Sequence, residues 1–187
     1  MINLNWKKRI FIVDNFYSDP DYIRSLALSM EYIPNLKYYK GVRSISKYVF
    51  KNTKESFENI MNEKIVRFNE YDACGRFQIC TPEDPLVYHV DTQKWAAMIY
   101  LSPDAPYESG TCLLSHKITK ARDKFDSNTN IVFRDGFYDK TKFDIVDIIG
   151  NVYNRLVIFD ASCIHAACQY FGNSKITGRL THLFFFD

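Results

Sequence analysis

Hydrophobic positions follow a helical spacing in the first part of the chain and change to a strand-like pattern near Gly75. Asp19-Pro20 supplies an N-cap followed by a proline suited to the first helical position, and apolar residues recur at helical spacing up to Met30. A second helix is predicted from Thr53, and its apolar face continues at similar steps to Phe68. The part before Gly75 is therefore expected to be mainly helical.

Short apolar or β-branched runs follow, separated by turn-forming clusters such as Ser102-Pro103-Asp104. The runs predicted to be strands are residues 76–80, 87–91, 96–101, 111–115, 145–149, 156–159, 164–169 and 179–186, with one earlier run at 9–13. Many short strands at even spacing are typical of a β-sandwich or jelly roll. The polar segment 117–144 is expected to be an excursion or lid over one end of the sheets.

The composition is that of a folded domain with a sizeable core. The chain has 187 residues, of which 47% are apolar, and neither a repeat nor a linker divides it. We predict one domain, residues 1–187, in which residues 1–74 support a jelly-roll core at residues 75–187. The expected fold class is mostly β with α, with the N-terminal helices packed on one sheet.

Charge and cysteine content argue against several classes of function. The chain has 24 Lys and Arg against 22 acidic residues, so no basic surface suited to nucleic acid is expected. No stretch approaches the roughly 20 apolar residues of a membrane span, and a polar start without a signal-peptide core predicts a cytoplasmic protein. The cysteines, none at CxxC spacing, are expected to be reduced thiols rather than zinc ligands. They are Cys74, Cys80, Cys112, Cys163 and Cys168.

Three side chains in the second part of the chain have metal-binding chemistry. His89 and Asp91 are two positions apart, so on a strand both would point to the same side. His165 follows an apolar run and a short turn. Two imidazoles and one carboxylate form the ligand set that holds non-haem Fe(II) and leaves coordination positions open. Each residue alone has an ordinary alternative, since HxD occurs by chance and a lone histidine is more often a satisfied core residue.

Arg179 begins the last predicted strand and would share a face with Thr181, Leu183 and Phe185. A buried guanidinium needs a partner, because an isolated charge is costly away from water. A bound carboxylate is one such partner, since it can accept two parallel hydrogen bonds from the planar guanidinium. The alternative is an internal salt bridge to one of the acidic residues.

Together these residues resemble the 2-oxoglutarate- and Fe(II)-dependent dioxygenases, particularly their prolyl 4-hydroxylase-like branch. The resemblance covers residues 75–187 and rests on the order HxD, distal His, Arg, and on the stretches that flank them. These stretches are Met98–Ser102 with Glu108–Thr111, Arg155–Phe159, and Gly178–Thr181. The resemblance implies a double-stranded β-helix, the jelly roll of this superfamily.

The resemblance also implies a role for each matching residue. These are the Fe(II) ligands His89, Asp91 and His165; the 2-oxoglutarate contacts Arg179, Tyr100 and Thr181; and the substrate-pocket residues Phe185 and Gln78. Fe(II) and 2-oxoglutarate are thus the expected cofactor and co-substrate, with ascorbate as an accessory reductant. The interval between His165 and Arg179 is longer than usual in this branch, so residues 170–176 are expected to bulge out as a loop.

The implied activity is hydroxylation of a protein side chain, such as a prolyl residue, or of a small amino-acid-like molecule. Because Asp91 supplies a carboxylate ligand, no position is left for a halide, which favours hydroxylation over halogenation. Phe185 stands where DNA-repair relatives carry a second arginine, which disfavours nucleic-acid substrates. Segments 32–48 and 117–142 are expected either to face the substrate or to be solvated surface. The alternative function is a non-oxidative, cupin-like metal- or ligand-binding module.

Overall fold

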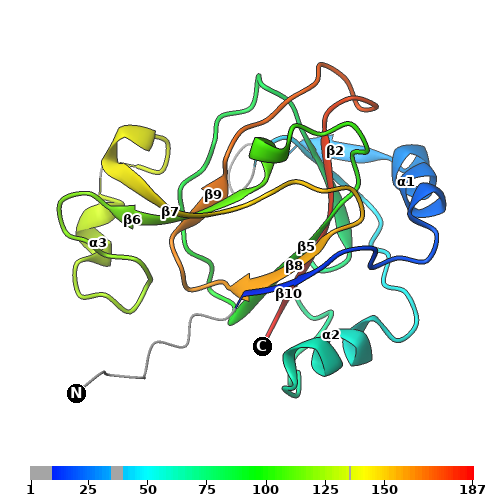
Figure 1. Ribbon diagram of the computed structural model, residues 1–187, viewed down its shortest axis with the longest axis horizontal. Helices are drawn as coiled ribbons and strands as arrows, with labels where there is room; N and C mark the ends of the chain where they lie inside the picture. The colour runs from blue at the N-terminus through cyan, green and yellow to red at the C-terminus, as the bar shows by residue number, and fades with distance from the viewer. Residues whose placement is uncertain (1–9, 35–39, 135) are drawn as a thin grey trace.

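The chain forms two antiparallel β-sheets and a few helices in a computed structural model that describes residues 10–34, 40–134 and 136–187 (Figure 1). The strands are β1 (Ile10–Val13), β2 (Tyr32–Pro34), β3 (Val42–Ser44), β4 (Arg76–Cys80), β5 (Trp95–Tyr100), β6 (Thr111–His116), β7 (Phe143–Ile149), β8 (Leu156–Asp160), β9 (His165–Ala167) and β10 (Arg179–Phe186). The helices are α1 (Pro20–Ser29), α2 (Thr53–Met61) and α3 (Thr129–Val132), with 3-10 turns η1 (Tyr107–Ser109) and η2 (Lys140–Lys142). No helix in the described ranges has the length and apolar character needed to cross a bilayer.

The large sheet has seven strands in the order β1-β8-β5-β10-β4-β3-β2, and the small sheet has the order β7-β6-β9. Side chains from both sheets line a common cavity, so the two sheets enclose the candidate site. This mostly β architecture with a few helices is consistent with the predicted jelly-roll class. Every run predicted to be a strand contains one, except residues 87–91.

The prediction of a strand at residues 87–91 is wrong. The segment makes one isolated antiparallel bridge, in which His89 and His165 exchange backbone hydrogen bonds of 3.0 and 2.8 Å. The neighbouring amides donate to carbonyls in loops instead: the Tyr88 N–H donates to the Phe137 carbonyl, and the Asp91 N–H donates to the Ala161 carbonyl. The backbone is thus satisfied by three separate partners rather than by one continuous ladder.

The N-terminal part contributes strands as well as helices. The sequence pattern did not indicate β2 and β3, which are three residues each and extend the large sheet beyond β4. The second helix is also shorter than predicted: it ends at Met61, because Asn62 adopts a left-handed conformation (φ 50°). Ile65 nevertheless remains in the core, and Phe68 packs against it.

The main hydrophobic core lies between the large sheet and the two N-terminal helices. Ile23 and Ala27 of α1 and Phe57 of α2 are buried there against alternate residues of the central strands. On β10 these are Leu180, Phe184 and Phe186, while Arg179, Thr181, Leu183 and Phe185 line the cavity on the other face. Fully burying one such large apolar side chain contributes about 1.5–3 kcal/mol. The predicted alternation on this strand is therefore confirmed.

His182 is the polar member of the core-facing side of β10, and it predicts an acid-sensitive stability. It is fully buried, with Nδ1 2.7 Å from the Tyr17 hydroxyl and Nε2 2.9 Å from the Tyr48 carbonyl. Burial lowers the pKa of His182 to about 3. The unfolded chain takes up the proton near pH 6.5, so it binds more protons than the folded chain between pH 6.5 and 3. Folding is therefore expected to lose stability from this group as the pH falls through that window.

The measurement is urea unfolding of wild type and His182→Gln at pH values from 7 to 4. The wild-type free energy of unfolding should fall more steeply than that of the variant, by up to about 1.4 kcal/mol per pH unit. Subtracting the variant's free energy of unfolding from that of wild type at each pH cancels the contribution of every titrating group that the two proteins share. Parallel curves would show that His182 is protonated as easily in the folded chain as in the unfolded one.

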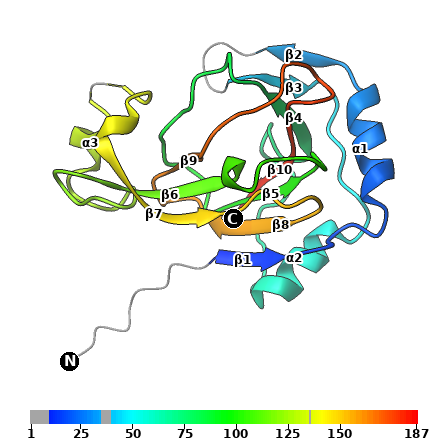
Figure 2. The same ribbon diagram turned by 45° about the horizontal axis from the view of Figure 1, so that its top comes forward.

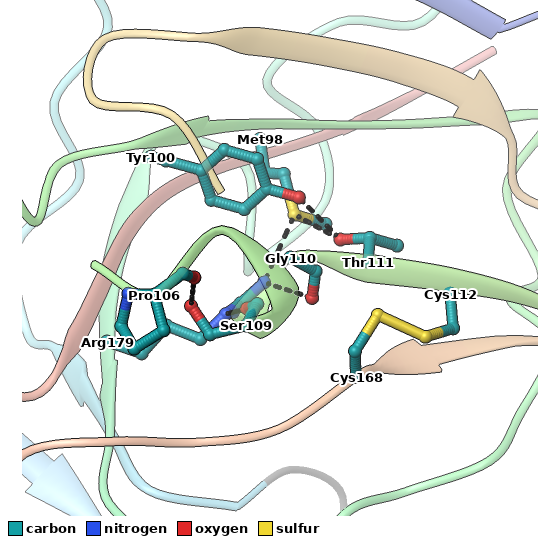
Figure 3. Close-up of a disulfide and its surroundings, with 9 residues drawn as sticks. All are labelled: Met98, Tyr100, Pro106, Ser109, Gly110, Thr111, Cys112, Cys168 and Arg179. Atoms are coloured by element: carbon teal, nitrogen blue, oxygen red, sulfur yellow. Dashed lines mark hydrogen bonds between the residues drawn. A yellow bond between two sulfur atoms is a disulfide. The ribbon is translucent and has the colours of Figure 1, made fainter. Parts of the chain in front are cut away.

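One cysteine pair forms a disulfide, which contradicts the expectation that all five thiols are reduced. Cys112 on β6 and Cys168 just beyond β9 are joined across the small sheet, 56 residues apart in sequence and with Cα atoms 5.3 Å apart (Figure 3). The pairing arises because β6 and β9 are antiparallel neighbours, with Cys112 opposite Ala166. No sequence spacing reveals this contact. Cys74, Cys80 and Cys163 form no disulfide and are buried, as predicted.

Loss of this disulfide is expected to lower the free energy of unfolding by about 2–4 kcal/mol, because the reduced unfolded chain gains conformational freedom. Thermal melts with and without a thiol reductant test this. A Cys112→Ala/Cys168→Ala double variant should melt like the reduced wild type and be insensitive to the reductant. A thiol count on the unreduced denatured chain should first give three, which shows that the disulfide is present. If the reductant then leaves the wild-type melting temperature unchanged, the disulfide does not stabilise the fold.

Candidate metal centre and adjoining cavities

The structure brings His89, Asp91 and His165 together. Their candidate ligand atoms all lie within 4.8 Å of one another, which is the spacing needed to hold one metal ion. Asp91 lies between the two imidazoles, with Oδ1 3.5 Å from His89 Nε2 and Oδ2 3.5 Å from His165 Nε2. The backbone bridge between the two histidines holds the β4–β5 connection against the start of β9. The predicted triad therefore forms, although residues 87–91 do not form the strand that was expected to carry His89 and Asp91.

Both imidazoles are oriented by the same local contact. Nδ1 of His89 lies 3.0 Å from the Val87 carbonyl, and Nδ1 of His165 lies 2.9 Å from the Cys163 carbonyl. A carbonyl accepts only from a protonated nitrogen, so Nε2 of each neutral ring carries the lone pair. Such a contact fixes the tautomer and direction of a metal-binding histidine. Both Nε2 atoms face Asp91, as a shared metal ion would require.

The buried carboxylate of Asp91 is suited to bind a cation. Its Oδ2 is buried and has no hydrogen-bond partner among the described residues. A buried anionic oxygen without a donor is costly, and a metal ion would remove that cost. The residues present therefore fit a divalent metal. Two nitrogens and one oxygen leave about three positions of an octahedral ion open, as in non-haem Fe(II) sites.

The three groups shift one another's proton affinities. Burial, with the neighbouring His165, lowers the pKa of His89 to about 4. Burial alone would lower the pKa of His165 and raise that of Asp91, but their mutual attraction prevails. The pKa of His165 is therefore raised, and that of Asp91 is lowered to about 2. Asp91 is thus ionised throughout the neutral range.

Metal affinity is expected to fall on acidification, because a metal ion must displace the proton that His165 acquires first. The raised pKa of His165 places the onset above pH 6.5, and His89 stays neutral to about pH 4. Between these values one proton competes, so the Kd for Ni(II) should rise by about tenfold per pH unit. Calorimetry at pH 8, 7, 6 and 5 measures this. Equal Kd values at pH 8 and 5 would contradict the ligand role of His165.

Arg179 lies at the inner end of a cavity of about 100 Å³ that the metal ligands also line. Its side chain is buried, with Nε 2.9 Å from the Ser109 carbonyl and Nη2 3.4 Å from the Gly110 carbonyl (Figure 3). Within the described ranges it forms no ion pair, so the predicted alternative of an internal salt bridge is not observed there. Among the described residues the guanidinium contacts backbone carbonyls, the Met98 sulfur and the Tyr100 ring, none of which is an anion, so the adjoining cavity is suited to an anion.

Tyr100 and Thr181 lie beside Arg179, as the resemblance implied. They are directly opposite each other on β5 and β10, and Thr181 lines the inner cavity. The Tyr100 hydroxyl is 2.8 Å from Thr111 Oγ1, and its ring lies 5.3 Å from the Arg179 guanidinium carbon. Burial raises the pKa of Tyr100, so its hydroxyl stays protonated and able to donate.

A second cavity of about 380 Å³ adjoins the first and is also lined by metal ligands. His89 and Asp91 line both cavities, and so do Gln78 and Phe185, the two residues expected to border the substrate. We call the smaller the inner cavity and the larger the outer cavity. A molecule in the outer cavity would therefore border the metal position at His89 and Asp91, in a space that Arg179 does not line.

Three further residues line both cavities and were not predicted individually: Arg43, Ala167 and Tyr170. Arg43 is on β3, a strand that the pattern did not indicate; it lies in segment 32–48, which was expected to face the substrate or solvent, but nothing distinguished Arg43 within that segment. Tyr170 lies in the loop after β9 whose extra length was noticed, but its direction could not be inferred. Residues 35–39 of the tyrosine-rich segment 32–48 lie outside the described residues.

Segment 117–144 was expected to be an excursion or a lid over one end of the sheets, and the structure shows an excursion: among its described residues none lines either cavity. Figures 1 and 2 place it with α3 at the far end of β6 and β7. It instead supports the chain that carries the metal ligands. The Lys124 ammonium donates to the carbonyls of Asp91, Thr92 and Gln93 at 3.0–3.3 Å, and the Arg122 carbonyl accepts the Ile164 N–H.

No protein-family model matches the chain, and no curated protein matches its sequence. Solved structures do show a similar fold. HygX from Streptomyces hygroscopicus, with nickel, 2-oxoglutarate and hygromycin B bound, gives a TM-score of 0.59 at 10% identity, over 95% of this chain and 82% of that one. A Pseudomonas putida prolyl-4-hydroxylase gives 0.51 at 15%, over 96% and 92%. AviO1 from Streptomyces viridochromogenes gives 0.53 at 10%, over 96% and 90%.

At these identities the likeness concerns the fold. One of these proteins is a prolyl-4-hydroxylase, and another holds a metal ion together with 2-oxoglutarate. These are features of the group that the order HxD, distal His and Arg resembles. The chain therefore shares the fold of these three proteins, which agrees with the superfamily resemblance drawn from its motifs.

Proposed function

We propose that the protein is an Fe(II)- and 2-oxoglutarate-dependent oxygenase that hydroxylates a small molecule or a protein side chain. The observation that carries this is the buried Arg179, which forms no ion pair with any other described residue, in the cavity that the His-Asp-His group also lines. A metal-binding module without a co-substrate would not need a cation there. We further take the two sheets to be the halves of a double-stranded β-helix.

Each residue then has a defined task. His89 Nε2, Asp91 and His165 Nε2 would hold the metal, which supplies oxygen activation when it is bound. Arg179 would pair with the distal carboxylate of 2-oxoglutarate, with the Tyr100 hydroxyl donating to the same carboxylate and Thr181 assisting. The inner cavity is too small for more than a co-substrate-sized molecule, so its walls would exclude bulk water.

The outer cavity would then hold the molecule to be hydroxylated. It is lined by the metal ligands His89 and Asp91 and not by Arg179, so a bound carbon could lie near the open coordination positions. The near balance of basic and acidic residues, and Phe185 in place of a second arginine, argue against a nucleic-acid substrate. Ascorbate would act as the accessory reductant that keeps the metal as Fe(II).

The test is conversion of 2-oxoglutarate to succinate by the purified chain loaded with Fe(II) in the presence of oxygen. We expect slow conversion alone and faster conversion with a substrate from a panel of free amino acids and proline-containing peptides. Chelated protein is the control and should be inactive. Protein that binds Ni(II) but neither binds nor converts 2-oxoglutarate would instead be the non-oxidative, cupin-like module.

A further inference from the structure

Three consecutive main-chain carbonyls, beginning with that of the candidate ligand Asp91, converge on one ammonium group. Lys124 Nζ lies 3.1, 3.0 and 3.3 Å from the carbonyls of Asp91, Thr92 and Gln93. An ammonium has three N–H donors, so this one side chain can donate to all three carbonyls at once. Residues 91–94 belong to neither a helix nor a strand, so no regular ladder fixes the main chain at Asp91.

The other main-chain contacts of this stretch lie at its two ends. The Asp91 N–H donates to the Ala161 carbonyl at 2.9 Å, and the Ala161 N–H donates to the Lys94 carbonyl at 3.0 Å. The Lys94 N–H donates at 2.7 Å to the carboxylate of Asp187, which also attracts the Lys124 ammonium. The carbonyls between these two ends are held by Lys124.

Lys124 is itself fixed to the segment that carries the third candidate ligand. Residues 122–124 pair with residues 162–164, which lead directly into His165. In this pairing the Lys124 N–H donates to the Ser162 carbonyl at 2.8 Å, and an isolated antiparallel bridge forms one residue further along. The pairing uses main-chain groups, so the side chain of Lys124 extends from one ligand-bearing segment to the other.

The three candidate ligands differ in what orients them. The Nδ1 atom of each imidazole contacts the carbonyl two residues before it. Asp91 Oδ2 accepts no hydrogen bond from the described residues, so the direction of the carboxylate depends on the position of its main chain. Lys124 lines neither cavity and donates to the main-chain carbonyl of Asp91. Its influence on a metal ion would therefore be exerted through the main chain of Asp91.

We propose that Lys124 is a positioning residue of the metal centre, which holds the Asp91 carboxylate where it can share a metal ion with the two imidazoles. This inference rests on the metal-binding part of the proposed function. Residues 122–124 then link the two segments that carry the ligands. Groups that orient metal ligands contribute about 10–100-fold to metal affinity, because they fix the ligands before the metal binds.

The experiment replaces Lys124 with methionine, which keeps a long apolar side chain and removes the three donors. Calorimetric titration of the full chain with Ni(II) at pH 8 should show a Kd about 10–100-fold higher than that of wild type. Lys124→Arg keeps a charged donor, so its Kd should lie between the two. Lys120→Met is the matched control, because this lysine of the same excursion pairs with Asp144 at the surface, and its Kd should equal that of wild type.

A second measurement separates positioning of Asp91 from general stabilisation of the fold. If Lys124 acts through Asp91, Lys124→Met should not weaken Ni(II) binding further in a chain that already carries Asp91→Ala. The Kd of the double variant should then stay within about twofold of that of Asp91→Ala alone. Independent effects would instead multiply, so that Lys124→Met would cause the same fold-change in Kd with and without the Asp91 carboxylate.

A folded Lys124→Met variant that binds Ni(II) within about twofold of wild type would overturn the proposal, even if it melts at a lower temperature. Equal fold-changes with and without Asp91→Ala would overturn it too. If Lys124→Met does not fold, Lys124→Gln, which keeps amide donors but no charge, replaces it in both measurements.

Failure of the proposed function gives different results. Wild type that does not bind Ni(II), or an Asp91→Ala variant that binds it normally, would remove the metal centre and this inference with it. Wild type that binds Ni(II) but not 2-oxoglutarate would contradict the oxygenase and leave the test of Lys124 intact, since the test measures metal affinity alone.

Discussion

Replacing Asp91 with alanine is expected to weaken metal binding more than any other single change. Loss of a residue that merely supports a ligand lowers metal affinity by about 10–100-fold, so loss of the carboxylate ligand itself should exceed about a hundredfold. The two histidines would remain, but they would lose the anionic group that lies 3.5 Å from both Nε2 atoms. Calorimetric titration with Ni(II) at pH 8 measures the effect.

A matched control is Asp144→Ala, which removes a carboxylate from the exposed strand β7 and should leave the Kd for Ni(II) unchanged. Folding provides a second check. Because Asp91 Oδ2 is buried and accepts no hydrogen bond from the described residues, the metal-free variant should be at least as stable as metal-free wild type. A variant that is folded and binds Ni(II) within tenfold of wild type would show that Asp91 is not a ligand.

The second large effect is expected for Arg179→Ala, which should weaken binding of 2-oxoglutarate by about a hundredfold. Truncating one partner of a buried, hydrogen-bonded charge pair costs about 2–5 kcal/mol, and Arg179 is the buried cation of the inner cavity. Arg179→Lys keeps the charge but loses the planar fork, so an intermediate loss is expected. Titration of the Ni(II)-loaded chain with 2-oxoglutarate measures both variants.

Binding of Ni(II) itself should stay within twofold of wild type in Arg179→Ala, because Arg179 is not among the three candidate ligands. This separates loss of the co-substrate site from loss of the metal. Arg67→Ala is the matched surface change and should bind 2-oxoglutarate normally. If Arg179→Ala binds 2-oxoglutarate as wild type does, the anion site must lie elsewhere, and Arg43 is the next cation to examine.

The sequence predicted well wherever one residue pattern determines one local structure. The alternation on the last strand placed Arg179 and Thr181 on the cavity face, and Asp19-Pro20 marked the start of α1. The grouping of His89 with His165 was suggested by residue type and order. Its geometry depends on a backbone bridge between distant segments, which no local pattern contains.

The parts that could not be predicted all depend on tertiary pairing. Strand β3 has three residues and forms because β4 offers an edge, so Arg43 could not be assigned to a cavity from its neighbours in sequence. The disulfide joins cysteines 56 residues apart through the pairing of β6 with β9. The sequence of segment 117–142 is typical of a polar surface, but its Lys124 ammonium donates a hydrogen bond to the backbone carbonyl of the candidate ligand Asp91.

The two faces of β10 have a consequence for how the site assembles. A slip of one residue against β4 and β5 would turn Arg179 and Thr181 into the helix-covered core and bring Phe184 into the cavity. The slipped arrangement would bury a charge without a partner and expose apolar surface, so it is penalised on both sides of the sheet. The register that forms the core is therefore also the one that forms the candidate site, so a ligand that binds the cavity stabilises the whole domain.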